Sequence, residues 1–283
     1  MSWQLLVGLS VFLYSVNGLF HRTLMKEEDS DAYAQAVVFV ALTGIFSFVI
    51  LLFRGGFQST LTLDILPLFL LAAFLSAMGM LCTFKGFKAI GASEHTILLT
   101  TSRLWLVLGA ILFLQEIFTL TKFAGTVLIL FGVVLAEWRR QKYVLNTGAY
   151  YVLLAAFIFA SGEVISYTII RNFDVVSYMV YGSIMVTTIL VAIKPKVIKK
   201  LSFYFKPKRA INIVATSFND TLANIFGLIA YQLGRNALQI GPIMATQTLL
   251  TVILAIIFLK ETDHMYQKIA GSLAAVIGTI LLL

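Results

Sequence analysis

Long apolar runs separated by short polar gaps fill the chain from end to end. A helix needs roughly 20 mainly apolar residues to cross a hydrocarbon core of about 30 Å. Each such run must be helical, because an unpaired backbone cannot face lipid. The runs fall at residues 3–24, 33–53, 64–87, 92–114, 118–137, 147–170, 175–193, 210–233, 237–259 and 266–283. The pattern predicts an all-α membrane protein with ten transmembrane helices.

The gaps between these runs differ in length and charge. A charged stretch, 26–31, separates the first two predicted helices. The longest gap, 194–209, carries seven Lys or Arg residues among apolar ones such as Ile198 and Phe205. This mixture is typical of a segment that lies on a membrane surface. A plain solvated loop explains it equally well.

The two halves of the chain repeat each other at an offset of 145–146 residues. The matching positions are Glu116 with Glu261, each ending a Phe-Leu-x-Glu run, Gly125 with Gly271, and Gly132 with Gly278. They predict two homologous halves of five helices, residues 1–142 and 143–283. Because five is odd, the second half inserts upside down. Inverted repeats of this kind are typical of secondary transporters, whose substrate site lies near the midplane. A duplicated scaffold that does not transport is the alternative.

These features resemble the drug/metabolite transporter (DMT) superfamily, in its ten-helix EamA-type branch. The resemblance rests on the doubled motif and on Asn-Asp-Thr-Leu-Ala-Asn at 219–224, and it covers the whole chain. It implies a secondary transporter of small metabolites or drug-like molecules, with a central cavity and alternating access. Ser102 and Gln247 stand where many members carry proline, so the resemblance does not imply one substrate class.

Composition agrees with a membrane protein, because only 12% of the residues are charged whereas about a quarter are charged in an ordinary soluble domain. The net charge of +8 lies mainly in the gaps. That placement indicates topology signals and contact with the lipid bilayer, and we expect no nucleic-acid partner. Cys82 is the single cysteine, and the three histidines are far apart in sequence, so we expect no metal site and no cofactor.

The distribution of Lys and Arg bears on orientation. Sixteen of them fall in odd-numbered gaps and four in even-numbered ones. Because short cytoplasmic loops are richer in Lys and Arg, the bias predicts that both termini face outward. Relatives usually place both termini in the cytoplasm, and we follow the charge bias. We expect a multi-pass protein of a bacterial or archaeal plasma membrane.

Three ionisable residues lie near the middle of predicted helices: Arg103, Glu163 and Asp220. A charge at this depth costs roughly 2.5–3.5 kcal/mol on insertion scales, so each is a functional candidate. Their sum of −1 favours a cationic or zwitterionic substrate, or a proton. Proton coupling through Glu163 or Asp220 is a hypothesis that follows from it.

Glu163 matches Asn17 by the repeat offset, and Tyr167 and Tyr14 lie one turn from them on the same helix faces. We expect a substrate site with Glu163 as its anionic anchor, lined by these residues. The alternative is a structural salt bridge between Glu163 and Arg103.

Further polar residues complete the candidate set. Asp220 and Asn224 share one helix face and form either a cavity wall or an interhelical hydrogen-bonding group. Arg103 is a candidate ligand for a substrate carboxylate or phosphate, and Gln247 joins the substrate-binding set. For Glu116 and Glu261, anchoring of a tight turn is favoured over gating.

Two rival classes remain. Ser161 before Gly162 resembles a serine nucleophile, but no histidine lies mid-helix to activate it, so no enzyme is expected. A non-transporting lipid-binding or accessory subunit is the main alternative to transport.

Overall fold

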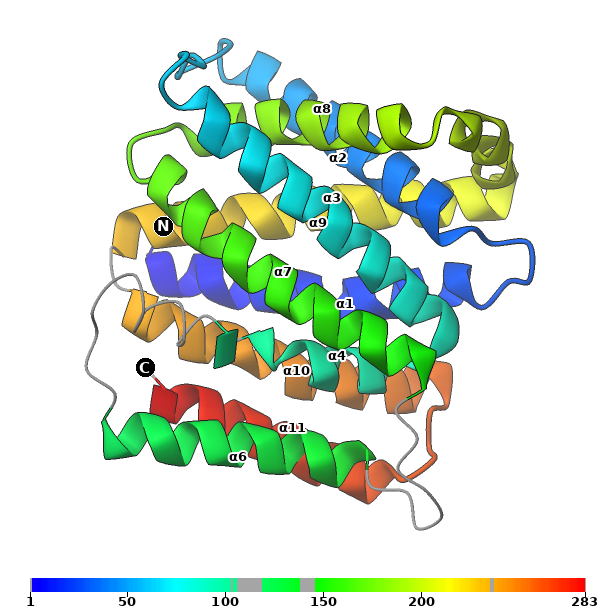
Figure 1. Cartoon of the computed structure of the whole chain (residues 1–283), viewed down its shortest axis with the longest axis vertical. Coiled ribbons are helices and arrows are strands. Elements are labelled where there is room, and N and C mark those ends of the chain that lie inside the picture. The colour runs from blue at the N-terminus through cyan, green and yellow to red at the C-terminus, as the bar shows by residue number, and fades with distance from the viewer. Residues whose placement is uncertain (1, 103, 106–118, 138–145, 235–236, 283) are drawn as a thin grey trace.

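The computed structural model describes residues 2–282 except 103, 106–118, 138–145 and 235–236. Every regular element in these residues is a helix, which confirms the all-α prediction (Figure 1). The elements are α1 (Trp3–Met25), α2 (Ala32–Phe53), α3 (Leu66–Ala89), α4 (Ala92–Leu99), α6 (Leu120–Glu137), α7 (Thr147–Ile170), α8 (Val175–Ile193), the 3₁₀ helix η1 (Pro195–Phe205), α9 (Pro207–Gly234), α10 (Ala237–Leu259) and α11 (Met265–Leu282).

The described helices coincide with the predicted spans to within a few residues. The predicted span 92–114 is described only in its first part, as α4 and the residues just after it. Six helices, α1, α2, α3, α7, α8 and α9, are long and apolar enough to cross a membrane, and α6, α10 and α11 contain shorter apolar stretches. The protein is therefore a multi-pass membrane protein.

Aspartates begin two of the spanning helices. Asp31 Oδ1 accepts hydrogen bonds from the backbone N–H groups of Tyr33 (2.9 Å) and Ala34 (3.0 Å) at the start of α2. Asp174 Oδ2 accepts one from Ser177 N (2.8 Å) at the start of α8. Such caps satisfy amides that have no partner within the helix. Burial raises the pKa of Asp31, but hydrogen bonds from Lys200 and the backbone outweigh burial and hold that pKa below its usual range.

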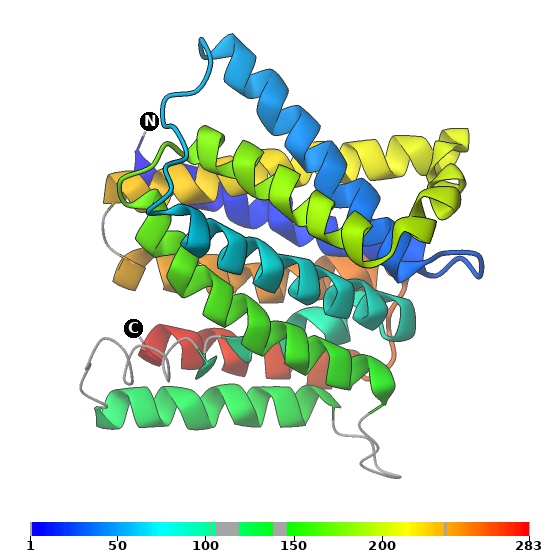
Figure 2. The ribbon, with the colours of Figure 1, turned by 45° about the horizontal axis from the view of Figure 1, so that its top comes forward.

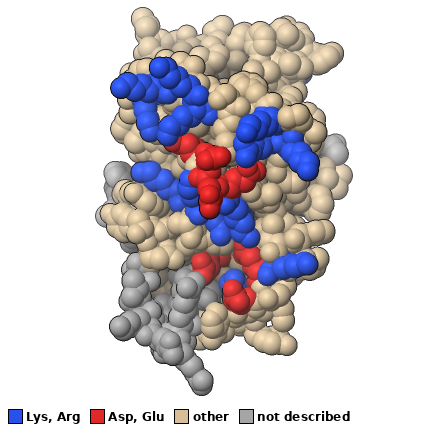
Figure 3. All heavy atoms as spheres, turned by 90° about the vertical axis from the view of Figure 1, so that its right-hand side faces the viewer, with Lys and Arg blue, Asp and Glu red and all other residues tan. Residues whose placement is uncertain are grey.

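The helices pair mainly across the two halves of the chain. α6 packs along α11, α3 along α7, α2 along α8, and α1 along both α9 and α10. Both termini lie at one end of the bundle (Figures 1 and 2), which we call the terminal end. The opposite end carries the α1–α2 connection and η1 and gathers Lys and Arg around a smaller acidic group (Figure 3). We call it the charged end.

Glycines set the close approach of α6 and α11. A Cβ atom on Gly132 would lie 2.5 Å from the carbonyl oxygen of Gly271, and one on Gly278 would lie 2.7 Å from that of Gly125. These are the four glycines of the repeated motif, and the relation is reciprocal. The motif therefore places two helix backbones in direct contact, as small residues do in membranes.

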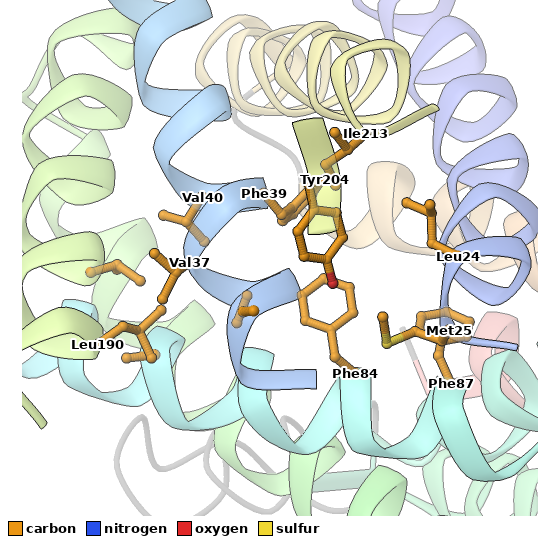
Figure 4. Packing of buried hydrophobic residues seen from close by; sticks show 14 of the residues in the cluster. Leu24, Met25, Val37, Phe39, Val40, Phe84, Phe87, Leu190, Tyr204 and Ile213 are labelled. Carbon is orange, nitrogen blue, oxygen red and sulfur yellow. The ribbon is translucent and has the colours of Figure 1, made fainter. Parts of the chain in front are cut away.

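Aromatic and aliphatic side chains fill the interior at the charged end. Tyr204 from η1 packs in one cluster with Phe39 of α2, Phe84 of α3, and Leu24 and Met25 of α1 (Figure 4). All five are almost fully buried. The bundle is thus tightly packed at this end.

Candidate functional site

A cavity of about 500 Å³ lies inside the bundle, between helices of both halves. Its described walls come from α1 to α4 and from α7 to α10, and no described residue of α6 or α11 lines it. Its polar and charged lining residues are Tyr14, Thr43, Ser76, Glu163, Ser166, Tyr178, Ser183, Asp220, Asn224, Tyr231 and Gln247. This volume fits a small organic molecule.

The cavity reaches the terminal end of the bundle. Phe69 and Tyr178 line it near the starts of α3 and α8, and Tyr231 lines it near the end of α9. All three of these helix ends are at the end of the bundle that carries the termini. The cavity therefore extends from the terminal end to the packed cluster around Tyr204, with which it shares Phe39, Val40, Ala73 and Val186.

The structure brings together most of the candidate residues predicted from sequence. Tyr14, Glu163, Asp220, Asn224 and Gln247 all line the cavity. Arg103 and the side chain of Tyr167 lie outside the described residues, and so does the proposed salt bridge between Glu163 and Arg103.

Asn17 reaches the cavity indirectly. It is buried, and its Nδ2 donates a hydrogen bond to Asp220 Oδ1 (3.1 Å). Its Oδ1 in turn accepts one from Asn219 Nδ2 (2.6 Å), which also donates to Leu13 O (2.7 Å). Asn224 Nδ2 donates to the other carboxylate oxygen of Asp220 (2.9 Å). Asp220 is therefore both a cavity residue and the centre of a polar network between α1 and α9.

A Ser–Tyr pair was not anticipated from the sequence. Tyr178 O–H donates to Ser166 Oγ (2.7 Å), and Ser166 Oγ donates to Gly162 O (2.8 Å). Both side chains line the cavity. Ser166 lies three positions after Glu163, so helical spacing alone signals a shared face. Tyr178 comes from a neighbouring helix, α8, and has no comparable signal.

The cavity is acidic in its described part. Glu163 and Asp220 line it, and no Lys or Arg is among its described lining residues. Aromatic rings line the same cavity, including those of Tyr14, Phe69 and Phe159. Carboxylates and π-faces together attract a positive charge, which is the chemistry that this arrangement offers a ligand.

Trp105 and Glu261 are not among the described residues that line the cavity. Trp105 packs edge-on against Phe157, with ring centroids 5.0 Å apart. Glu261 lies just after a tight turn at Lys260, whose φ is 55°. Its carboxylate accepts hydrogen bonds from Ala92 N (3.0 Å), Ser93 N (3.2 Å) and Ser93 Oγ (2.9 Å). Glu261 thus caps α4 from the other half of the chain, whereas Glu116 lies outside the described residues.

The sequence of this chain matches a known family in both of its halves. The sequence model of the EamA-like transporter family matches residues 1–138 and, a second time, residues 146–283. The chain belongs to this family. Membership in this family makes it a membrane transporter of the DMT type. EamA-like proteins form a transporter family, which favours transport over catalysis. Ser161 Oγ donates to Phe157 O (3.0 Å) within its own helix.

A solved structure has the same fold as this EamA-like chain. It is a crystal structure described only as that of a protein, with a TM-score of 0.66 and 14% sequence identity, and the match covers 99% of this chain and 96% of the other. No curated protein matches the chain. In the part of the chain that the structure describes, no group of three His, Cys, Asp or Glu residues is placed to hold a metal ion.

Proposed function

We propose that this protein is a secondary active transporter that moves a small organic cation or zwitterion by alternating access. A bacterial or archaeal plasma membrane is the setting we propose for it. The observation that carries the proposal is the cavity between the two halves, with Glu163 and Asp220 in its walls.

The cavity lining supports the substrate class. A cationic group placed between the two carboxylates gains electrostatic attraction at a depth where water screens little. The rings of Tyr14, Tyr178 and Tyr231 offer further surface to an amine or a quaternary ammonium group. An apolar body would contact Phe69 and Phe159. An amine with an aromatic or aliphatic body therefore fits best, and a zwitterion fits if Arg103 faces the same space.

The pairing of helices supports two inverted five-helix repeats. Exchanging the halves turns α1, α2, α3, α4 and α6 into α7, α8, α9, α10 and α11. Under this exchange the α6–α11 and α2–α8 contacts map onto themselves. The α3–α7 contact maps onto α9–α1, and the α1–α10 contact maps onto α7–α4. In such an arrangement, one half rocking on the other exposes the cavity to each side in turn.

Proton coupling belongs to the same proposal. A carboxylate in the cavity holds either a proton or a cationic substrate, so binding of one releases the other. Glu163 and Asp220 are both candidate coupling groups, because both carboxylates line the cavity.

Thermal stability of the purified protein tests the substrate class. Pools of amines, amino acids, carboxylates, sugars and phosphates are compared at two pH values. A ligand at 100 times its dissociation constant stabilises the folded state by about 2.7 kcal/mol. We expect amines or zwitterions to raise the melting temperature of the wild type and not that of Glu163→Gln. Glu28→Gln, at an exposed carboxylate of the charged end, serves as the control and keeps the shift.

Flux in proteoliposomes then tests coupling. With the ligand found above, an imposed pH gradient should drive uptake in the wild type and in Glu28→Gln, and not in Glu163→Gln. Undiminished pH-driven flux in Glu163→Gln removes Glu163 as the coupling group. A well-folded protein that responds to none of the pools would favour the alternative, a non-transporting lipid-binding or accessory subunit.

A further inference from the structure

We propose that η1 and the start of α9 form a docking surface for anionic phospholipids of the leaflet at the charged end. The surface consists of residues 194–209. Its occupant is the phosphate-bearing headgroup together with the first part of its acyl chains. This inference is independent of what the central cavity carries.

The segment is held in place by one face. Val197 and Tyr204 are 0% and 1% exposed, and both pack in the cluster with Phe39 and Leu190. Tyr204 points into the bundle (Figure 4), and its O–H donates to Asp31 O (3.4 Å). A segment anchored in this way presents its remaining side chains in fixed positions and differs from a freely moving loop.

The outer face combines positive charge with apolar side chains. Lys194, Lys196, Lys199, Lys200, Lys206 and Lys208 are all exposed. Ile198 is 57% exposed and Phe205 is 77% exposed between them. An interfacial segment typically directs such apolar side chains to the acyl boundary and its lysines to lipid phosphates. Contact with lipid would remove the apolar ring of Phe205 from water.

The position along the chain places this face at headgroup depth. The segment follows directly on the end of α8 at Ile193 and precedes the apolar part of α9. Both helices are membrane spans, so the residues between them lie where the hydrocarbon ends. The same end of the molecule gathers Lys and Arg side chains on its surface (Figure 3).

Part of the positive charge is already neutralised by the α1–α2 connection. Lys200 pairs with Asp31, and Arg209 pairs with Glu27. No ion pair within the described residues joins Lys196, Lys199 or Lys206 to a carboxylate, and the same holds for Lys208. These four lysines remain available to phosphate oxygens.

A hollow in this surface is large enough to hold a lipid headgroup. Its volume is about 410 Å³, and it is lined by Asp29, Lys200, Ser202, Phe203, Lys206 and Arg209. The guanidinium carbon of Arg209 lies 3.8 Å from the ring centroid of Phe203, which fixes one cationic wall. Lys206 is the cation of this lining that remains available to a phosphate oxygen, because Lys200 and Arg209 pair with Asp31 and Glu27 and Asp29 adds a negative charge.

Lipid binding to the full-length protein in neutral detergent tests the proposal. The protein is titrated with phosphatidylglycerol or phosphatidylcholine, and bound lipid is counted by native mass spectrometry. We expect the wild type to prefer phosphatidylglycerol and to lose that preference in high salt, because exposed charges are screened. Equal binding of the two lipids at low salt overturns the proposal and favours a solvated loop.

Two quadruple variants test the location. The first replaces Lys196, Lys199, Lys206 and Lys208 with Gln. The second, a control with the same loss of charge, replaces Lys26, Lys85, Arg171 and Lys260 with Gln. We expect the first variant to bind phosphatidylglycerol at least about tenfold more weakly, since each basic residue near an anionic surface adds attraction. The control should change binding less than threefold. Equal losses in the two variants overturn the assignment to residues 194–209.

Two further experiments separate the apolar contribution to lipid binding from the contribution of phosphate. Replacing both Ile198 and Phe205 with Ser should weaken binding of both lipids, because the apolar contact does not depend on headgroup charge. Millimolar inorganic phosphate should not displace phosphatidylglycerol. Displacement by phosphate would overturn leaflet docking in favour of a site for a free anion. Thermal unfolding of each variant confirms that its fold is intact.

Discussion

Asp220 shows how a membrane protein keeps a carboxylate in its interior. Amide groups from α1 and α9 donate to both of its carboxylate oxygens, so the carboxylate does not lie unpaired in an apolar environment, where it would be costly. Asn219 extends the network by binding both Asn17 and the carbonyl of Leu13. The side chain thus joins two helices and also borders the cavity.

Replacing Asn17 tests this network. Asn17→Ala removes the donor to Asp220 Oδ1 and the acceptor of Asn219, so we expect a loss of about 0.6–2 kcal/mol in unfolding free energy, the range for polar contacts between membrane helices. Unfolding in mixed micelles measures it. Ser161→Ala is the control, because Ser161 bonds only within α7, and it should stay within about 0.5 kcal/mol. Equal stability of Asn17→Ala and the wild type would contradict a structural role for the network.

Residue-level prediction from sequence succeeds where helical spacing suffices and fails where two helices must be brought together. Glu163, Asp220 and Asn224 were recognised because a charged or amide side chain in an apolar run stands out. The contact of Asn17 with Asp220 and that of Tyr178 with Ser166 depend on tertiary packing. The repeat offset matches Asn17 with Glu163, but it does not reveal that Asn17 contacts Asp220 in the fold.

At the scale of elements, the spans were predictable because a single chain segment in lipid can satisfy its backbone hydrogen bonds only as a helix. The boundaries of α7, α8 and α10 agree with the apolar runs to the residue. Sequence alone leaves the segment between α8 and α9 open, because its basic and apolar residues suit both an interfacial segment and a solvated loop. Its structure is a 3₁₀ helix with Val197 and Tyr204 buried, which a hydropathy pattern does not reveal.

The α6–α11 contact gives a test at this scale. Gly132→Ala places a methyl group 2.5 Å from Gly271 O, and we expect a loss of about 1–3 kcal/mol from overpacking. Gly8→Ala meets nothing within 4 Å, so the same substitution there should stabilise α1 by up to about 1 kcal/mol. Chemical unfolding of the two variants gives the sign of each change in unfolding free energy. Two variants of equal stability would mean that α6 and α11 lie further apart.

For the molecule as a whole, the two ends differ in how they are closed. Aromatic packing, the cap of Glu261 on α4 and ion pairs to the α1–α2 connection all lie at the charged end. Arg22 of α1 adds a link by donating to Phe87 O (2.6 Å) at the end of α3. The cavity reaches the other end, and we expect this conformation to be closed at the charged end.

Removing the cap should loosen that seal. Glu261→Ala deprives Ala92 N and Ser93 N of their acceptor, which we expect to cost about 1–3 kcal/mol and to open the charged end. The probe is Met80→Cys at the cavity wall, in a Cys82→Ser background. A membrane-impermeant maleimide added from the charged end should label it several-fold faster with Glu261→Ala than with Glu28→Ala. Equal labelling would show that Glu261 has no part in closing this end.

The pairing of helices across the halves also bears on how the protein is made. The main partners of α1, α2, α3 and α6 are α9, α8, α7 and α11, and these are synthesised later. The first half therefore leaves the ribosome with its packing faces turned to lipid, and it stays so until the second half has been inserted. Substitutions in α11 or α9 should then act on the maturation and turnover of helices inserted well before them.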